Sequence, residues 1–231
     1  MEAIANEGNT LGRAEARAFV QPIAAPSILG LYGFAGATLV VASNLAGWWG
    51  NSSTALFLFP FAAFFGGLAQ FMAGMWAYRA RDGLATAMHG MWGSFWMAYG
   101  VLNLLFATGT LTPPAGAFPA LGFWFIALGW ITWMGFIASM AESAALAWVL
   151  GTLAAGSTSA AIGMISGSHG WTVLAGYLFV ISAVIAWYTA TALMFESTYG
   201  RSILPVGKTK HAREAPRLVA GLGEPGVKHG Q

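Results

Sequence analysis

The segment Thr54-Ala-Leu-Phe-Leu-Phe-Pro-Phe-Ala-Ala-Phe-Phe65 is apolar at every position after its first residue. A membrane β-strand needs about 10 residues of alternating polarity, and this segment does not alternate. The apolar run continues to about residue 78, which is long enough for a helix to cross a hydrocarbon core of about 30 Å. The segment therefore predicts a membrane-spanning helix.

The composition of the whole chain favours the same class of protein. Of 231 residues, 57% are hydrophobic and only 8% are charged, and the mean hydropathy is +0.65. Soluble domains carry about 25% charged residues, so we interpret the chain as an all-α integral membrane protein. The sequence has no Cys, which excludes disulfides and Cys-ligated metal sites. We expect no metal, no cofactor and no nucleic-acid partner.

Apolar stretches of about 20 residues, joined by short connections, predict a six-transmembrane-helix bundle. Pro60 lies inside the second stretch, so we expect that helix either to start late or to kink there. Small residues recur in it at helical spacing, at Ala69, Ala73 and Ala77, which predicts close helix packing. The stretches span approximately residues 27–47, 55–78, 84–107, 118–139, 142–165 and 171–195.

The basic residues predict the orientation. All 10 Lys and Arg residues lie in the tails or in the connection after the second stretch. Because basic residues favour the cytoplasmic side, we expect a multi-pass protein of the plasma membrane with both termini cytoplasmic. The expected domains are a cytoplasmic N-terminal tail at 1–24 with an interfacial helix at 9–20, a transport domain at 25–207, and a basic, disordered tail at 208–231.

The interiors of the expected spans contain no Asp, Glu, Lys or Arg. A charge inside a bilayer is costly, so we interpret the chain as a path for a small, weakly polar solute. A buried primary amide needs several hydrogen-bond partners, so Gln70 and Asn103 each either join two helices or line a wet path. His89 is interpreted as a capping or headgroup-contacting residue in preference to a proton relay. The candidates for the substrate path are Leu31, Thr38, Gln70, Ser94 and Asn103.

Enzyme chemistry is not expected of this chain. No Ser/His/Asp set, carboxylate pair or His-rich zinc motif lies in the apolar stretches, and hydrolytic or acid–base catalysis needs one of these.

Three stretches, taken in their order and spacing, carry a family resemblance. They are Ala25-Pro-Ser-Ile-Leu-Gly-Leu-Tyr-Gly-Phe34, then Gly66-Gly-Leu-Ala-Gln-Phe-Met-Ala-Gly74 with Gly93-Ser-Phe-Trp96, and finally Glu196-Ser-Thr-Tyr-Gly-Arg-Ser-Ile-Leu-Pro-Val-Gly207. Together they resemble the acetate uptake transporter family, which includes the bacterial succinate-acetate permeases and related yeast acetate and ammonia-export proteins.

The resemblance implies a six-helix protomer that assembles into a ring-like homohexamer in the lipid membrane. Each protomer would hold its own path for acetate and related short monocarboxylates, sometimes succinate. Matching by position implies a hydrophobic constriction of Phe34, Trp92 and Leu153. Trp92 stands where the bacterial permeases have Tyr, and Ala77 stands where they have Glu late in the second span.

The mode of transport and two other functions stay open at this point. A bare carboxylate loses several kcal/mol or more on entering an apolar constriction, so such a ring favours the protonated acid over the anion. Proton-coupled uptake and channel-like passage both fit. The other hypotheses are a channel for a small neutral solute such as ammonia or urea, and a membrane scaffold or sensor that transports nothing.

Overall fold

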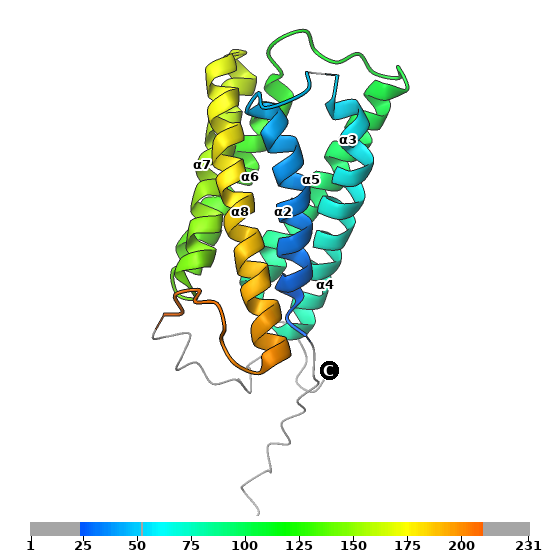
Figure 1. The fold of residues 1–231 in the computed structure, drawn as a ribbon. Coiled ribbons are helices and arrows are strands. Elements are labelled where there is room, and N and C mark those ends of the chain that lie inside the picture. Colours follow the sequence, from blue (N-terminus) through cyan, green and yellow to red (C-terminus); the bar gives the residue numbers. More distant parts are fainter. Residues whose placement is uncertain (1–23, 52, 210–231) are drawn as a thin grey trace, which may run out of the picture. The chain divides into compact units, whose positions relative to one another are not determined.

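The computed structural model describes residues 24–51 and 53–209, which are helical and contain no named strand (Figure 1). The prediction of an all-α fold is confirmed for these residues. The helices are α2 (Pro26–Leu45), α3 (Ala55–Phe61), η1 (Ala62–Leu68), α4 (Ala69–Ala80), α5 (Gly83–Ala107), α6 (Pro119–Ser139), α7 (Ala144–Ser166) and α8 (His169–Tyr199). Because α3, η1 and α4 follow one another without a break, they form one rod.

Within the described residues, five helices are long and apolar enough to cross a membrane. They are α2, the rod from Leu56 to Ala80, α6, α7 and α8. The exception is α5, which has 25 residues but whose apolar sequence is interrupted by several Gly residues, His89, Ser94 and Asn103. The predicted boundaries of the apolar stretches agree with the helix bounds to within a few residues.

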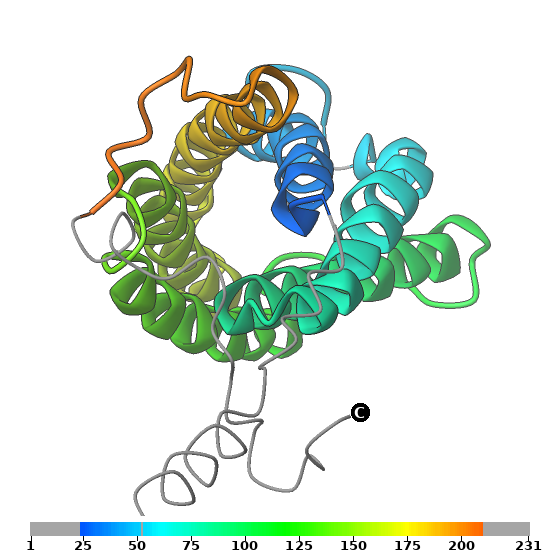
Figure 2. The ribbon, with the colours of Figure 1, turned by 90° about the horizontal axis from the view of Figure 1, so that it is seen from below.

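The rods form a ring in which each packs against its two neighbours, and α2 also contacts α5 (Figure 2). Going round the ring, α2 is followed by α8, α7, α6, α5 and then the rod α3–η1–α4, which returns to α2. The short connections make consecutive helices antiparallel neighbours. The contact of α2 with α8 joins the two ends of this helical unit and closes the ring.

The helix that contains Pro60 begins before it, at Ala55, so the late start, one of the two expected alternatives, is wrong. After the proline the helix widens into η1, a π-helix over Ala62–Leu68. Proline has no N–H to donate to the carbonyl four residues back, and in membrane helices a local π adjustment can satisfy the freed backbone groups. In this widened turn Gly66 lies against the indole of Trp96 on α5.

Glycine permits a close approach between α4 and α5. A Cβ atom on Gly74 would lie 2.7 Å from the backbone nitrogen of Gly90. On the same rod, Ala73 and Ala77 are 1% and 0% exposed. Helices in hydrocarbon attract one another largely by van der Waals contact, which small residues allow at short range. The predicted packing role of this helix face is confirmed.

The segment after α8 runs back to the start of α7 (Figure 2). There the backbone N–H groups of Ala144 and Ala145 donate to the carbonyl oxygens of Gly207 and Val206, both at 3.0 Å. The first amides of a helix have no partner within the helix. The returning segment therefore caps α7.

The sequence analysis assigned Lys208 to the C-terminal tail, but in the structure this residue is bound to the helical unit. Its Nζ atom pairs with Glu196 Oε1 at 2.6 Å. The backbone N–H of Thr209 donates to the carbonyl oxygen of Glu142. The rest of the predicted tail, 210–231, and the predicted interfacial helix at 9–20 lie outside the described residues.

The α4–α5 contact gives a prediction about stability. We expect Gly74→Ala to lower the midpoint of thermal unfolding in detergent, because its methyl group meets backbone that cannot move aside; overpacking of this kind costs about 1–3 kcal/mol. Gly90→Ala is the matched control, since a Cβ there meets nothing within 4 Å. Equal loss of stability in the two variants would contradict this account of the contact.

Candidate functional site

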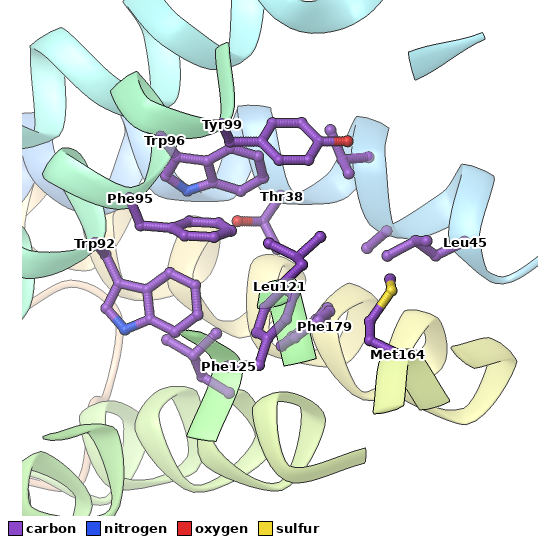
Figure 3. A pocket seen from close by; sticks show the side chains of 13 residues that line it. Thr38, Leu45, Trp92, Phe95, Trp96, Tyr99, Leu121, Phe125, Met164 and Phe179 are labelled. Carbon is purple, nitrogen blue, oxygen red and sulfur yellow. The ribbon is translucent and has the colours of Figure 1, made fainter. Parts of the chain in front are cut away.

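A cavity of about 100 Å³ lies inside the ring (Figure 3). Its residues on α2 lie in the second half of that helix, so the cavity occupies the end of the bundle at which α2 and α5 finish, called here the upper end (Figure 1). A single water needs roughly 10–15 Å³ of such space, so a solute of a few heavy atoms fits. The lining residues are Thr38, Val41, Ala42, Leu45, Trp92, Phe95, Trp96, Tyr99, Leu121, Phe125, Leu153, Met164 and Phe179.

The three residues of the predicted constriction lie at the lower end of this cavity. Trp92 on α5 and Leu153 on α7 line it, and each is the lowest lining residue of its helix. Phe34 on α2 packs on Trp92, with ring centroids 6.4 Å apart and ring planes at 69°. All three side chains are at most 3% exposed. Their role in limiting passage stays a prediction.

The indole of Trp92 is fixed by a hydrogen bond and by ring contacts. Its Nε1–H group donates to Thr132 Oγ1 on α6 at 3.0 Å. Thr132 is fully buried and donates in turn to the carbonyl oxygen of Leu128 at 2.6 Å. The ring also lies edge-on to Phe95, at 5.4 Å between centroids. Trp92 therefore has one defined position between α5 and α6.

Two polar atoms of the cavity wall have no partner. Thr38 Oγ1 and Trp96 Nε1 are buried and make no hydrogen bond within the described residues, and both residues line the cavity. In Figure 3 the hydroxyl of Thr38 points toward the aromatic side chains of α5. Most other Ser and Thr hydroxyls of the described helices donate to their own helix, as Ser157 does to the carbonyl of Leu153. Both atoms can donate to a carboxyl group in the cavity.

Two more of the predicted path residues lie below the cavity. Leu31 is 4% exposed and precedes Phe34 by one turn of α2. Gln70 on α4 is 3% exposed and lies beside Gly33 of α2. Its Oε1 atom is buried and has no hydrogen-bond partner among the residues described. Gln70 therefore offers an acceptor near the level of Phe34.

Ser94 and Asn103 are not brought to the cavity. The Ser94 hydroxyl donates to the carbonyl oxygen of Gly90 at 2.8 Å, and Asn103 Nδ2 donates to that of Tyr99 at 2.8 Å. Both bonds stay within α5. The headgroup contact expected of His89 is wrong, because this side chain is only 5% exposed and packs between helices.

Apart from Trp92, the aromatic wall of the cavity was missed in the sequence. On α5, Trp92, Phe95, Trp96 and Tyr99 all line the cavity, at the i, i+3, i+4, i+7 spacing of one helix face. That spacing was a usable signal. This spacing is a weak signal in α5, because the helix is apolar on every side and no polar face shows which side points away from the interior.

Comparison with known proteins gives consistent similarities. The GPR1/FUN34/yaaH family matches residues 8–208. The succinate-acetate/proton symporter SatP of Escherichia coli (strain K12) is 27% identical over 189 residues, which are 81% of this chain and 97% of that protein. Ammonia transport outward protein 2 of Saccharomyces cerevisiae is 30% identical over 190 residues, 80% of this chain and 66% of that protein. The solved structure of the bacterial acetate channel SatP matches with a TM-score of 0.74 and 26% identity, covering 80% of this chain and 100% of that one.

The bond between Trp92 and Thr132 gives a prediction about the site. Thr132→Val leaves the indole N–H buried without a partner, which costs about 1–3 kcal/mol. We expect a lower midpoint of thermal unfolding and a changed tryptophan fluorescence spectrum. Thr152→Val is the control, because the Thr152 hydroxyl donates only to carbonyls of its own helix. A Thr132 variant as stable as this control would contradict the anchoring role.

Proposed function

This chain belongs to the GPR1/FUN34/yaaH family, and we propose that it is a membrane transporter for acetate and related short-chain carboxylates. The observation that carries the proposal is the small, almost wholly apolar cavity with two unpartnered polar atoms, from Thr38 and Trp96, in its wall. A solute with a short apolar body and one hydrogen-bonding end fits such a wall. The names of the similar bacterial proteins, a succinate-acetate/proton symporter and an acetate channel, support the same class of substrate.

The proposed topology has six membrane crossings, both termini in the cytoplasm and location in the plasma membrane. Helix α5 is included because it occupies a full place in the ring between α4 and α6, and its 25 residues reach about 37 Å. With the basic residues on the inner side, the upper end of the bundle faces outward. The transport domain is proposed to be residues 25–207, and the assembly a homohexamer.

Large apolar side chains on the outside of the ring support a lipid-embedded assembly. Phe57, Trp130 and Trp148 are 76%, 69% and 65% exposed. Lipid, or a second copy of the chain, is the surrounding that such a surface needs.

The proposed mechanism rests on the cost of desolvating a carboxylate. An ion that enters the apolar ring of Phe34, Trp92 and Leu153 loses its hydration and finds no described cation nearby to replace it, so the protonated acid crosses more easily. At pH 7 only about one carboxylic acid molecule in several hundred to a thousand is protonated. The almost wholly apolar cavity at the outer side of this constriction also favours the neutral acid, because burial disfavours the charged form of a carboxyl group.

A channel for ammonia remains the second candidate, because one similar yeast protein is named as an ammonia exporter. Competition separates the two functions. If acetate is the substrate, unlabelled acetate suppresses uptake of labelled acetate into proteoliposomes, and ammonium does not. If the path carries ammonia, labelled acetate uptake does not exceed that of empty liposomes.

The constriction is tested by acetate flux in proteoliposomes. We expect Phe34→Ala and Trp92→Ala to widen the ring and to raise the rate of butyrate relative to acetate by roughly tenfold, the scale on which a pocket discriminates small differences in size. Phe57→Ala removes an equally large ring from the outer surface and serves as the control. Unchanged rate and selectivity in both constriction variants would remove the proposed gate.

The polar atoms of the cavity are tested by saturation of the same flux. Thr38→Val keeps the shape of the side chain but removes its hydroxyl. We expect the half-saturating acetate concentration to rise about fivefold, as the loss of one hydrogen bond predicts, and Trp96→Phe to act in the same direction. Ser159→Ala is the control, because its hydroxyl donates to its own helix at Ala155. Equal half-saturation in Thr38→Val and wild type would contradict the binding role.

A further inference from the structure

His89 is the one acidic or basic residue of the described helices that lies more than one turn from a helix end. The others, Arg79, His169 and Glu196, lie in first or last turns. An imidazole is also the side chain that gains and loses a proton near neutral pH. A proton that crosses this bundle by way of a side chain therefore has His89 as its candidate carrier.

The ring of His89 is enclosed between α5 and α2. The side chain is 5% exposed, and its Nδ1 atom is buried without a hydrogen-bond partner. A Cβ atom on Gly30 would lie 2.5 Å from both Nδ1 and Cε1 of the ring. The imidazole thus fills the recess that the missing side chain of Gly30 leaves in α2. An unpaired buried polar atom costs free energy, and a partner that arrives in transit relieves that cost.

The position of His89 continues the lining of the cavity downward. On α5 the lining residues begin at Trp92, and His89 precedes it by one turn on the same face. On α2 the contact of Phe34 with Trp92 is followed, one turn lower, by that of Gly30 with His89. These are successive contacts of the same two helices. His89 therefore lies directly below the proposed constriction, on the side that we assign to the cytoplasm.

Helix α2 packs on the imidazole of His89. No residue of this helix, Pro26–Leu45, is acidic, basic or His. The hydroxyl of its one tyrosine, Tyr32, is bonded to Thr191 on α8. Helix α6, which meets this stretch of α5 through Gly135 and Met88, also has no ionisable residue between Pro119 and Ser139.

The remaining ionisable neighbours belong to α4 and to α5 itself. Arg79 and Tyr78 lie in the last turn of α4, and Tyr78 is 66% exposed. Asp82 lies nearly two turns below His89 and caps α5 by accepting from Ala85 N–H at 2.8 Å. No described carboxylate therefore holds the imidazole in its charged form by direct pairing.

We propose that His89 receives the proton of the carboxylic acid after the acid has passed the constriction, an inference that rests on the proposed transport of acetate. The neutral ring accepts a hydrogen bond at Nδ1 from the carboxyl O–H. The O–H bond breaks and an N–H bond forms, which leaves a carboxylate and an imidazolium. The carboxylate moves on to the cytoplasm, and the imidazolium gives its proton to water at that side and returns to the neutral form.

The test is the pH dependence of acetate uptake into proteoliposomes that contain the full-length protein. Total acetate is adjusted at each pH, from about 3 to 7, so that the concentration of undissociated acid stays constant. We expect the wild-type rate to fall as the pH falls, because a protonated ring cannot accept. We expect His89→Gln to be about tenfold slower at the higher pH values and independent of pH. His169→Gln, which replaces an exposed histidine at the start of α8, should keep the wild-type profile.

A purely structural role for His89 predicts a different result. His89→Gln would then lower the rate evenly and keep the wild-type slope, and that outcome overturns the proposal, as does a flat wild-type profile. If wild-type proteoliposomes take up no acetate above empty liposomes, the proposed function itself fails, and the two failures are thereby distinct.

A measurement on the wild-type protein covers the case in which His89→Gln does not fold. In protein labelled with ¹⁵N-histidine, acetic acid should shift the Nδ1 resonance of His89, and propionic acid should do the same. Gly30→Ala, which displaces the ring, identifies the resonance. An Nδ1 resonance that acetic acid does not move overturns the proposal.

Discussion

The cost of taking a charge from water into an apolar medium governs this molecule, because it decides where every ionisable side chain can lie. The cations and carboxylates of the described helices stay in first and last turns, and the described Lys and Arg residues lie on one side of the bundle. The same cost of removing a charge from water also affects Glu142, at the turn between α6 and α7. Residue Glu142 is exposed as a whole, yet packing around its carboxyl group, with a further contribution from the charge of Asp82, raises its pKa to about 7. The interior of the bundle therefore contains uncharged polar groups and aromatic side chains of defined size and shape.

Close packing of small residues makes that interior possible. Gly74 against Gly90 and Gly66 against Trp96 bring the π-containing rod onto α5, and α5 in turn presents its aromatic face to the centre of the ring. The indole of Trp92 is then fixed from the other side by Thr132. The cavity is therefore not a gap left by loose packing. It is bounded by rings whose positions are set by contacts behind them, so a change in a packing glycine reaches the path through Trp96 or Trp92.

Sequence reasoning found the helices and their approximate ends, because a hydrocarbon core imposes one length and one composition on each crossing. It also named Thr38, Trp92 and Leu153, which line one cavity, but the last two came from the positions of a family motif and not from periodicity. It did not find Phe125 or Phe179, since a ring on another helix leaves no local signal. It placed Ser94 and Asn103 on the path because a buried polar residue is conspicuous in a sequence, whereas in the structure both hydrogen-bond within α5. Which buried hydroxyl or amide stays unpaired depends on the neighbouring turn, and that cannot be read from residue types.

The unpaired atoms differ in kind along the path, and this difference bears on how a weak acid crosses. In the cavity above Phe34 the Trp96 indole is a donor only, and the Thr38 hydroxyl can donate, so this wall suits the oxygen atoms of a carboxylate. At and below Phe34 the unpaired atoms are Gln70 Oε1 and His89 Nδ1. An amide oxygen accepts only, and a neutral imidazole accepts at its unprotonated nitrogen, so this part of the path suits a carboxyl group that still carries its proton. A solute therefore meets hydrogen-bond donors before the constriction and acceptors after it. To bond with those acceptors it must still carry its proton when it passes Phe34. The neutral acid is also the form that enters the apolar constriction at the lowest cost in free energy.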